Sequence, residues 1–184
     1  RRKSICTSRS FADMIDDEKE LMLRVSDFAA MCARKLREEG SAASDVTTFM
    51  YTNRFRDDLE QYFPSATIRL EVAANSTQEI VGAALKAFRA IYRPGYKYKK
   101  AGVMVGNITS EDAIQASMFD FDEELRRKQD KLSEVMDAMD NLQSSHGNLL
   151  RLATQRPGHY ADGIRSDFRS RLYTTSLDDI IEVR

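Results

Sequence analysis

The sequence lacks most of the features that mark an enzyme active site or a membrane protein. No HExxH, CxxC, GxSxG or P-loop pattern occurs, and the two histidines, His146 and His159, lie beside or near glycine and proline in turn-rich sequence. Cys6 and Cys32 are too few for a disulfide framework, which favours a reducing cytosol. No apolar run approaches the roughly 18–20 residues that span a bilayer. We therefore expect no catalytic residue, metal ligand, bound cofactor or membrane segment in this chain.

Net charge is also nearly absent, since 28 basic residues balance 29 acidic ones. No overall field attracts the chain to nucleic acid or membrane, so any such attraction must come from local patches. The first residue is Arg1 and no signal peptide is recognisable, which favours an excised part of a larger cytoplasmic protein.

The hydrophobic pattern predicts an α+β domain over residues 1–109. Alternating or β-branched stretches predict strands, and apolar residues spaced by three and four predict helices. The expected elements are strands at 3–11, 45–53, 66–72 and 96–108, helices at 16–39 and 76–92, and a loop at 40–44. Ser76 and Glu79 form a capping-box pattern at the second helix. The order β-α-β-β-α-β predicts a four-stranded sheet with both helices on one face and the other face open.

Composition changes after this domain. Residues 111–141 hold ten acids against four bases. We expect a linker at 110–121 and, over 122–184, a mostly helical or irregular C-terminal extension. Its first part, 122–142, predicts a helix whose apolar side carries Leu125, Leu132, Val135, Met136 and Met139.

Positive charge is concentrated near the end of the domain. Residues 86–100 contain six bases and no acid, with three tyrosines interleaved, and the N-terminus adds further bases and hydroxyl residues. Such side chains suit the phosphate backbone of a nucleic acid, which positions a protein without reading sequence. The alternative is a solvated basic edge that only guards against aggregation.

Several stretches carry a resemblance to a known family. "KSICTSRSF", then a long helix and "FMYTNRF", resembles the start of the little finger domain of Y-family DNA polymerases, and "YKYKKAGVMVGNI" resembles its last strand. The tail "RLYTTSLDDIIEVR" resembles the C-terminal signature of UmuC-like proteins, the catalytic subunits of bacterial DNA polymerase V. "LSEVMDAMDNLQSSHG" resembles the stretch before that signature.

The resemblance implies the DNA-binding and protein-binding region of an error-prone translesion polymerase that acts in SOS damage tolerance. Its partners would be primer–template DNA, the sliding clamp, a UmuD-like subunit and the RecA filament, in the bacterial cytoplasm at the nucleoid. The Mg²⁺-binding carboxylates of such polymerases lie in the palm, which this chain lacks, so we expect binding without catalysis. The expected DNA-binding residues are Lys3, Ser8, Arg9, Ser10, Arg69, Arg93, Lys97, Lys99 and Lys100.

The resemblance also implies a clamp-binding motif directly after the little finger: a glutamine, two residues, then two large apolar residues. Residues 115–119 match this pattern, with Gln115, Ser117, Met118 and Phe119 as the expected contacts. The alternative is that Met118 and Phe119 pack the following helix onto the sheet.

Two other classes of function stay open at this point. One is a protein-binding regulator in which the basic stretch is incidental. The other is an unrelated α+β RNA-binding module, against which the missing RNP-type aromatic strand counts.

Overall fold

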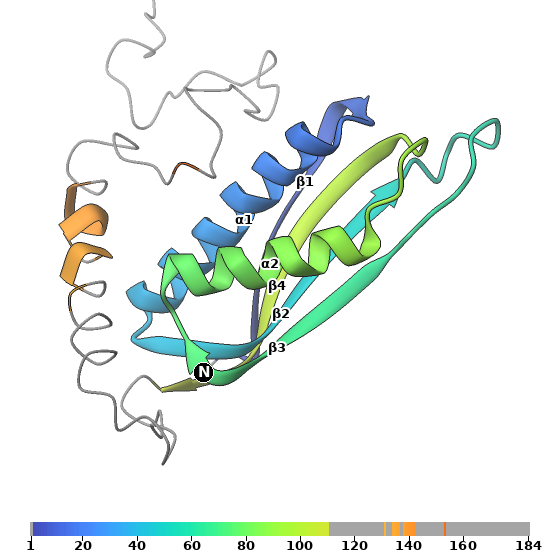
Figure 1. Cartoon of the computed structure of the whole chain (residues 1–184). Helices are drawn as coiled ribbons and strands as arrows, with labels where there is room; N and C mark the ends of the chain where they lie inside the picture. The colour runs from blue at the N-terminus through green and yellow to red at the C-terminus, as the bar shows by residue number, and fades with distance from the viewer. Residues whose placement is uncertain (1, 111–130, 132–133, 137, 143–152, 154–184) are drawn as a thin grey trace, which may run out of the picture.

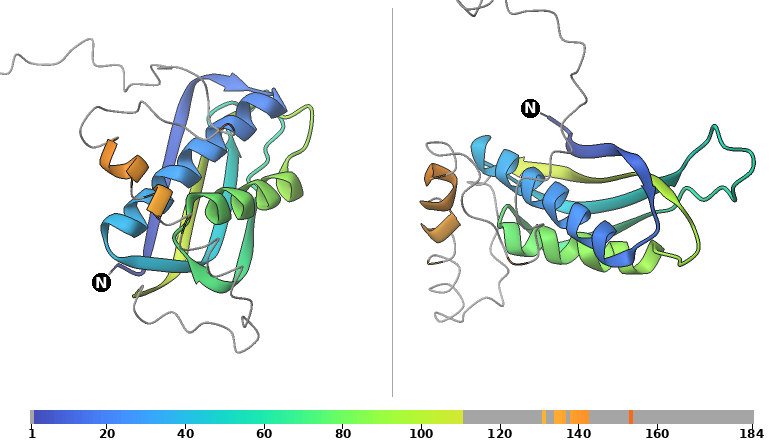
Figure 2. Two further views of the ribbon diagram at one scale, coloured as in Figure 1. Left: turned by 60° about the vertical axis from the view of Figure 1, so that its left-hand side comes forward. Right: turned by 90° about the horizontal axis from the view of Figure 1, so that it is seen from above.

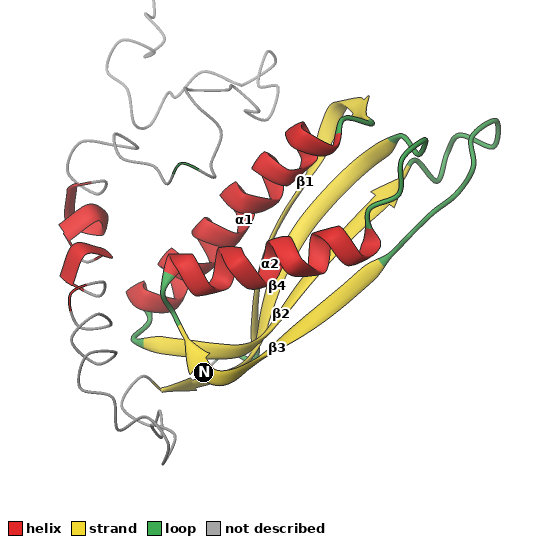
Figure 3. Cartoon of the chain, viewed as in Figure 1, coloured by secondary structure: helices red, strands yellow, loops and turns green. Residues whose placement is uncertain are grey.

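The computed structural model describes residues 2–110, 131, 134–136, 138–142 and 153 (Figure 1). Residues 4–110 form six elements in the predicted order β-α-β-β-α-β, coloured by type in Figure 3. These are β1 (Ser4–Ile15), α1 (Glu18–Glu38), β2 (Ser41–Thr52), β3 (Ser65–Ala74), α2 (Thr77–Ile91) and β4 (Tyr98–Ser110). The α+β class is confirmed.

The four strands form one antiparallel sheet in the order β1-β4-β2-β3. Each helix connects two strands that are separated by one strand of the other β-α-β unit. Both helices lie on the same face of the sheet, as the view from above in Figure 2 shows, so this prediction is also confirmed. Among the described residues, no helix lies over the opposite face (Figure 2).

The core lies between the sheet and the two helices. Leu21, Val25 and Leu36 of α1 and Ile80 and Phe88 of α2 are completely buried, as are Val46, Met50, Val103 and Val105 on the inward side of β2 and β4. Full burial of one such side chain is worth about 1.5–3 kcal/mol, so this layer holds the sheet against the helices. Side chains alternate along a strand, so burial of these residues also determines which residues of the same strands face outward.

Both helices begin at a capping side chain. The Asp17 carboxylate accepts a hydrogen bond from the Lys19 amide at 2.7 Å. The Ser76 hydroxyl accepts from the Glu79 amide at 3.3 Å and donates to the Glu79 carboxylate at 2.6 Å. The capping role predicted for Ser76 is confirmed. The Glu79 carboxylate accepts from the Ser76 hydroxyl, whereas in a capping box it would accept from the Ser76 backbone amide. Within the described part of the chain, no helix has the length and apolar character to cross a membrane.

The loop predicted over residues 40–44 is wrong, because β2 already begins at Ser41. Gly40 lies between the end of α1 and the start of β2 and has a φ of +55°, a conformation that favours glycine. Ala42 and Ala43 are then completely buried and pair with Thr109 and Ile108 of β4. Small residues have little strand propensity of their own, but here partner strands supply the ladder and burial that stabilise the strand.

Arg37, in the last turn of α1, joins three parts of the described structure. Its Nε and Nη2 donate to the two carboxylate oxygens of Asp140, at 2.7 and 3.1 Å. Its Nη1 donates to the Asn75 carbonyl oxygen at 2.8 Å and to Thr77 Oγ1 at 3.0 Å. The guanidinium therefore ties residues 138–142 to the end of α1 and to the β3–α2 connection.

The helix predicted over 122–142 is described only in part, and its described residues are helical. Met136 is buried as predicted, but Val135 is 53% exposed and does not belong to the buried side. Met136 lies four residues before Asp140, so both side chains lie on the same side of the helix. This is the side that contacts Arg37. Val135 points about 100° away from Met136 around the helix axis. Leu125 and Leu132 lie outside the described residues.

Candidate nucleic-acid interface

The sheet face opposite the helices, here called the open face, is the candidate interface. Strand register and alternation place polar, small and aromatic side chains on it. The outward residues are Ser4, Cys6, Ser8 and Ser10 of β1, Lys100, Gly102, Met104 and Gly106 of β4, Asp45, Thr47, Phe49 and Tyr51 of β2, and Ser65, Thr67, Arg69 and Glu71 of β3.

Lys100 lies near one end of this face. It pairs with Ser10 of β1 on one side and with Tyr51 of β2 on the other. The next row along the strands joins Ser8, Gly102 and Phe49. An ammonium group beside a serine hydroxyl offers both charge and hydrogen bonds to phosphate oxygens.

Arg69 lies on the same face but near its other end. It is paired in register with Asp45, and its Nε is 3.9 Å from the Asp45 carboxylate. Its side chain is 78% exposed, so the ion pair is weak and the guanidinium stays accessible. Four of the nine predicted DNA-binding residues thus lie on the open face: Ser8, Ser10, Arg69 and Lys100.

The other five predicted residues do not lie on this face. Arg9 and Lys99 alternate with the outward residues, and Lys99 Nζ donates to the Ala12 carbonyl oxygen at 2.8 Å. Arg93 and Lys97 lie in the α2–β4 connection, where the Arg93 guanidinium is 4.9 Å from the centre of the Tyr62 ring. Lys3 is exposed and directly precedes β1. These bases lie at the rim of the sheet or beside it.

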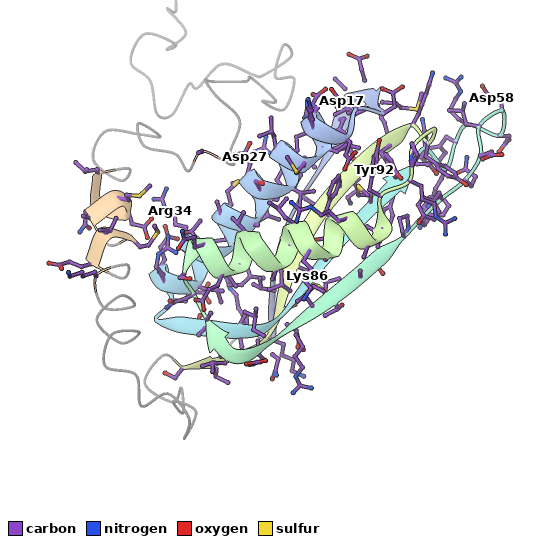
Figure 4. All side chains as sticks on the ribbon, in the orientation of Figure 1. Asp17, Asp27, Arg34, Asp58, Lys86 and Tyr92 are labelled. Atoms are coloured by element: carbon purple, nitrogen blue, oxygen red, sulfur yellow. The ribbon has the colours of Figure 1, made fainter. Side chains whose placement is uncertain are left out.

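The basic run read from the sequence as one patch is divided by the fold. Lys86 and Arg89 are exposed on α2, in the layer that covers the other side of the sheet, and Figure 4 shows where Lys86 lies. Sequence proximity to Lys100 therefore does not bring them to the open face. They serve instead as a charge-matched comparison for it.

An aromatic row on the open face is a feature that sequence reasoning missed. The rings of Phe49 and Tyr51 are 5.2 Å apart, and Phe63 meets Tyr51 edge-on at 5.8 Å. The spacing of two between Phe49 and Tyr51 within a strand was the available signal. The position of Phe63 was not readable, because it comes from the connector after the strand.

Gly102 allows the Phe49 ring to lie against β4. A Cβ atom at Gly102 would come within 2.4 Å of Ser8 Cβ and 2.5 Å of Phe49 Cζ. Ser8 Cβ is attached directly to the backbone, so it has little freedom to retreat. The close approach of these three residues thus depends on the missing side chain.

We expect Gly102→Ala to lower the free energy of unfolding by about 1–3 kcal/mol, because the added methyl group overpacks this contact. Gly106→Ala on the same strand and face is the control, since its Cβ would meet nothing closer than Asp45 Cβ at 4.0 Å. Urea denaturation of the two variants compares them. Equal stability of both would contradict the close packing of Phe49 on Gly102.

The two cysteines differ in environment. Cys6 is exposed on the open face, whereas Cys32 is buried in α1, with Sγ 3.3 Å from Thr7 Oγ1 and 3.5 Å from the Val103 carbonyl oxygen. Burial raises the pKa of the Cys32 thiol, which keeps it protonated and unreactive. Cys6 is therefore the accessible thiol of the chain.

The connector between β2 and β3 carries acids at its tip. Arg56 donates two hydrogen bonds of 2.7 Å to the Asp58 carboxylate and lowers its pKa to about 2. Figure 4 shows Asp58 at the far end of this connector, beyond the sheet. Among the described residues, no three His, Cys, Asp or Glu side chains are grouped so that they could hold a metal ion.

The expected clamp-binding residues Gln115, Ser117, Met118 and Phe119 lie outside the described residues, as do His146 and His159. The structure describes the sheet up to Ser110, the residue at which the expected linker begins. The domain boundaries expected at 109 and 121 stay predictions.

A sheet with one uncovered, partly basic face is typical of domains that bind an extended partner across the strands. Residues 2–118 match the model of the impB/mucB/samB family C-terminal domain. The chain belongs to this family. The predicted resemblance to the C-terminal region of UmuC-like proteins is thereby confirmed.

Individual relatives agree with this assignment. The chain is 32% identical over 183 residues to Protein UmuC of Salmonella typhimurium, covering 100% of this chain and 42% of that protein. It is 25% identical over 120 residues to DNA polymerase IV of Staphylococcus aureus, covering 65% of this chain and 32% of that protein. The chain thus spans less than half the length of these relatives.

One solved structure, a complex of the beta-clamp processivity factor and the little finger domain of PolIV, aligns with 63% of this chain and 98% of that chain. The identity is 14% and the TM-score is 0.39.

Proposed function

We propose that this chain is the DNA-binding and partner-binding part of a translesion DNA polymerase, and that its open face binds the phosphate backbone of primer–template DNA. The observation that carries the proposal is the placement of Lys100 beside Ser10 and one row from Ser8, on a sheet face that no described helix covers. Membership in the impB/mucB/samB family and similarity to a DNA polymerase IV support it. Contacts to phosphates give affinity with little sequence preference.

The salt dependence of binding tests this proposal. If about four phosphates are neutralised, the logarithm of the binding constant falls with the logarithm of salt concentration at a slope of roughly −3 to −4. Lys100→Ala removes one contact, so we expect this slope to become shallower by about one. The measurement is fluorescence anisotropy with a labelled primer–template duplex at several salt concentrations.

Lys86→Ala is the matched control, because it removes the same charge from the helix layer. We expect its slope to equal that of the unchanged chain. Equal effects of the two variants would indicate binding through net charge rather than through the open face. An affinity that does not depend on salt would refute the proposal.

The remaining expectations concern partners and activity. We propose that residues 115–119 bind the sliding clamp, on the strength of their sequence pattern and their position directly after the sheet domain. A UmuD-like subunit and the RecA filament stay predictions from the resemblance. The chain should also incorporate no nucleotide, because the family resemblance implies that the metal-binding carboxylates belong to the palm.

A further inference from the structure

The aromatic row on the open face continues beyond the strands. Backbone hydrogen bonds from Met50 to Pro64 and from Thr52 to Tyr62 extend the hairpin past Ser65, so Phe63 lies directly opposite Tyr51. Tyr51 is therefore flanked by Lys100 on one side and by Phe63 on the other. One row of side chains thus crosses the whole width of the sheet, formed by Ser10, Lys100, Tyr51 and Phe63.

The outer end of this row is exposed and carries positive charge. Phe63 is 40% exposed, and the Arg54 guanidinium lies 5.0 Å from the centre of its ring. Tyr51 and Phe49 are partly exposed and face the same side. An exposed ring with a cation against it offers both a stacking surface and a charge for phosphate.

Charge on the open face is divided between its two ends. Lys100 and Arg54 lie at the aromatic end, close to Tyr51 and Phe63. Asp45 and Glu71 lie toward the opposite end of β2 and β3, where Asp45 faces Arg69. A polyanion that crosses the open face is therefore favoured at the aromatic end.

We propose that Tyr51 and Phe63 form a stacking platform for unpaired bases of single-stranded DNA next to the duplex held by the open face. Away from its ends, duplex DNA presents base edges, sugars and phosphates to a protein, because its base faces are stacked on one another. Single strands expose the faces that aromatic side chains recognise, and they do so regardless of sequence. The platform thus binds the template overhang while Lys100 contacts a phosphate, and this inference rests on the proposed function.

The test compares a primer–template duplex that has a 5′ template overhang with a blunt duplex of the same length, using the 184-residue chain. We expect tighter binding of the overhang substrate by the unchanged chain. A 2-aminopurine in the overhang should lose fluorescence on binding, because stacking on a ring quenches it. This second readout needs no substitution and so does not depend on how a variant folds.

Tyr51→Leu and Phe63→Leu keep an apolar side chain and remove the ring. We expect each to weaken binding of the overhang substrate by roughly tenfold, as for loss of one base–aromatic stack, and to restore 2-aminopurine fluorescence. Binding of the blunt duplex should not change. Tyr51→Phe keeps the ring and should bind as the unchanged chain does. Phe55→Leu is the matched control, because Phe55 is 93% exposed in the same connector.

The outcomes separate this inference from the proposed function. Lys100→Ala should weaken binding of both substrates. If it does so while the leucine variants leave overhang binding and fluorescence unchanged, the proposed base stacking on Tyr51 and Phe63 is wrong, whereas phosphate binding by the open face is supported. Equal affinity of the unchanged chain for both substrates would overturn the platform as well. If Lys100→Ala changes neither substrate, the proposed function itself fails.

Discussion

We expect that replacing Met118 and Phe119 together with alanine lowers the affinity of the chain for a bacterial sliding clamp by at least a hundredfold. Each anchor buries apolar surface worth about 1.5–3 kcal/mol, so the pair contributes up to about 3–6 kcal/mol. Every 1.4 kcal/mol or so is a factor of ten in affinity. Ordering a peptide segment on binding offsets part of such a gain, so the intact contact should be of modest strength. Surface plasmon resonance on an immobilised clamp measures the change.

The same segment provides a control for the clamp assignment and a test of the alternative that Met118 and Phe119 belong to a core. Replacing Asp120 and Asp122 with asparagine should change clamp affinity little, because flanking acids mainly keep the cluster soluble. DNA binding should survive the double alanine change, since Lys100 lies on β4. If the double change lowers the melting temperature of the chain and leaves clamp affinity unchanged, these side chains belong to a core and the clamp assignment is wrong.

Arg37→Met should lower the free energy of unfolding by about 2–3 kcal/mol, the second large effect that we expect. The guanidinium makes four hydrogen bonds to Asp140, Asn75 and Thr77, and only 12% of its side chain is exposed. Removing it strands acceptors in a poorly solvated site, which costs more than the pair itself contributes. The 22% exposure of Asp140 reduces this cost, because water reaches its carboxylate. Urea denaturation gives the free energy.

Arg34→Met is the matched control for Arg37→Met on the same helix. Arg34 and Glu38 lie one helical turn apart and form an ion pair of 2.9 Å, with side chains 33% and 55% exposed. Because water reaches both groups, loss of this pair should cost under about 1 kcal/mol. A double-mutant cycle with Asp140→Asn isolates the contact between the helix end and residues 138–142. A cost for Arg37→Met no larger than for Arg34→Met would show that this contact is unimportant.

Periodicity was sufficient to predict both helices and the β-α-β-β-α-β order of elements along the chain. The apolar stripe of α1 and the alternation in β3 reflect burial against a single layer, and local pattern records such one-sided burial directly. The start of β2 could not be read in this way. Ala42 and Ala43 are held by pairing with β4, about 65 residues later in the sequence, and no local propensity reports such a partner.

The candidate site was predicted only in part for a related reason. Ser8, Ser10 and Lys100 were all among the predicted DNA-binding residues, and the pairing of β1 with β4 brings them together on the open face. Lys86 was grouped with Lys100 by nearness in sequence, although α2 and β4 belong to different layers. Phe63 joins Tyr51 only through the extended hairpin, which depends on backbone pairing and not on the sequence pattern.

The natural cysteines allow a direct test of whether DNA lies on the open face. Cys6 is exposed on that face and Cys32 is buried, so a thiol-reactive photocrosslinker attaches to Cys6 in the folded chain. Irradiation with primer–template DNA should give a strong protein–DNA crosslink. Lys86→Cys in a Cys6→Ser background places the same reagent on the helix layer and should give little. Efficient crosslinking from position 86 together with none from Cys6 would contradict the assignment of the open face as the DNA-binding surface.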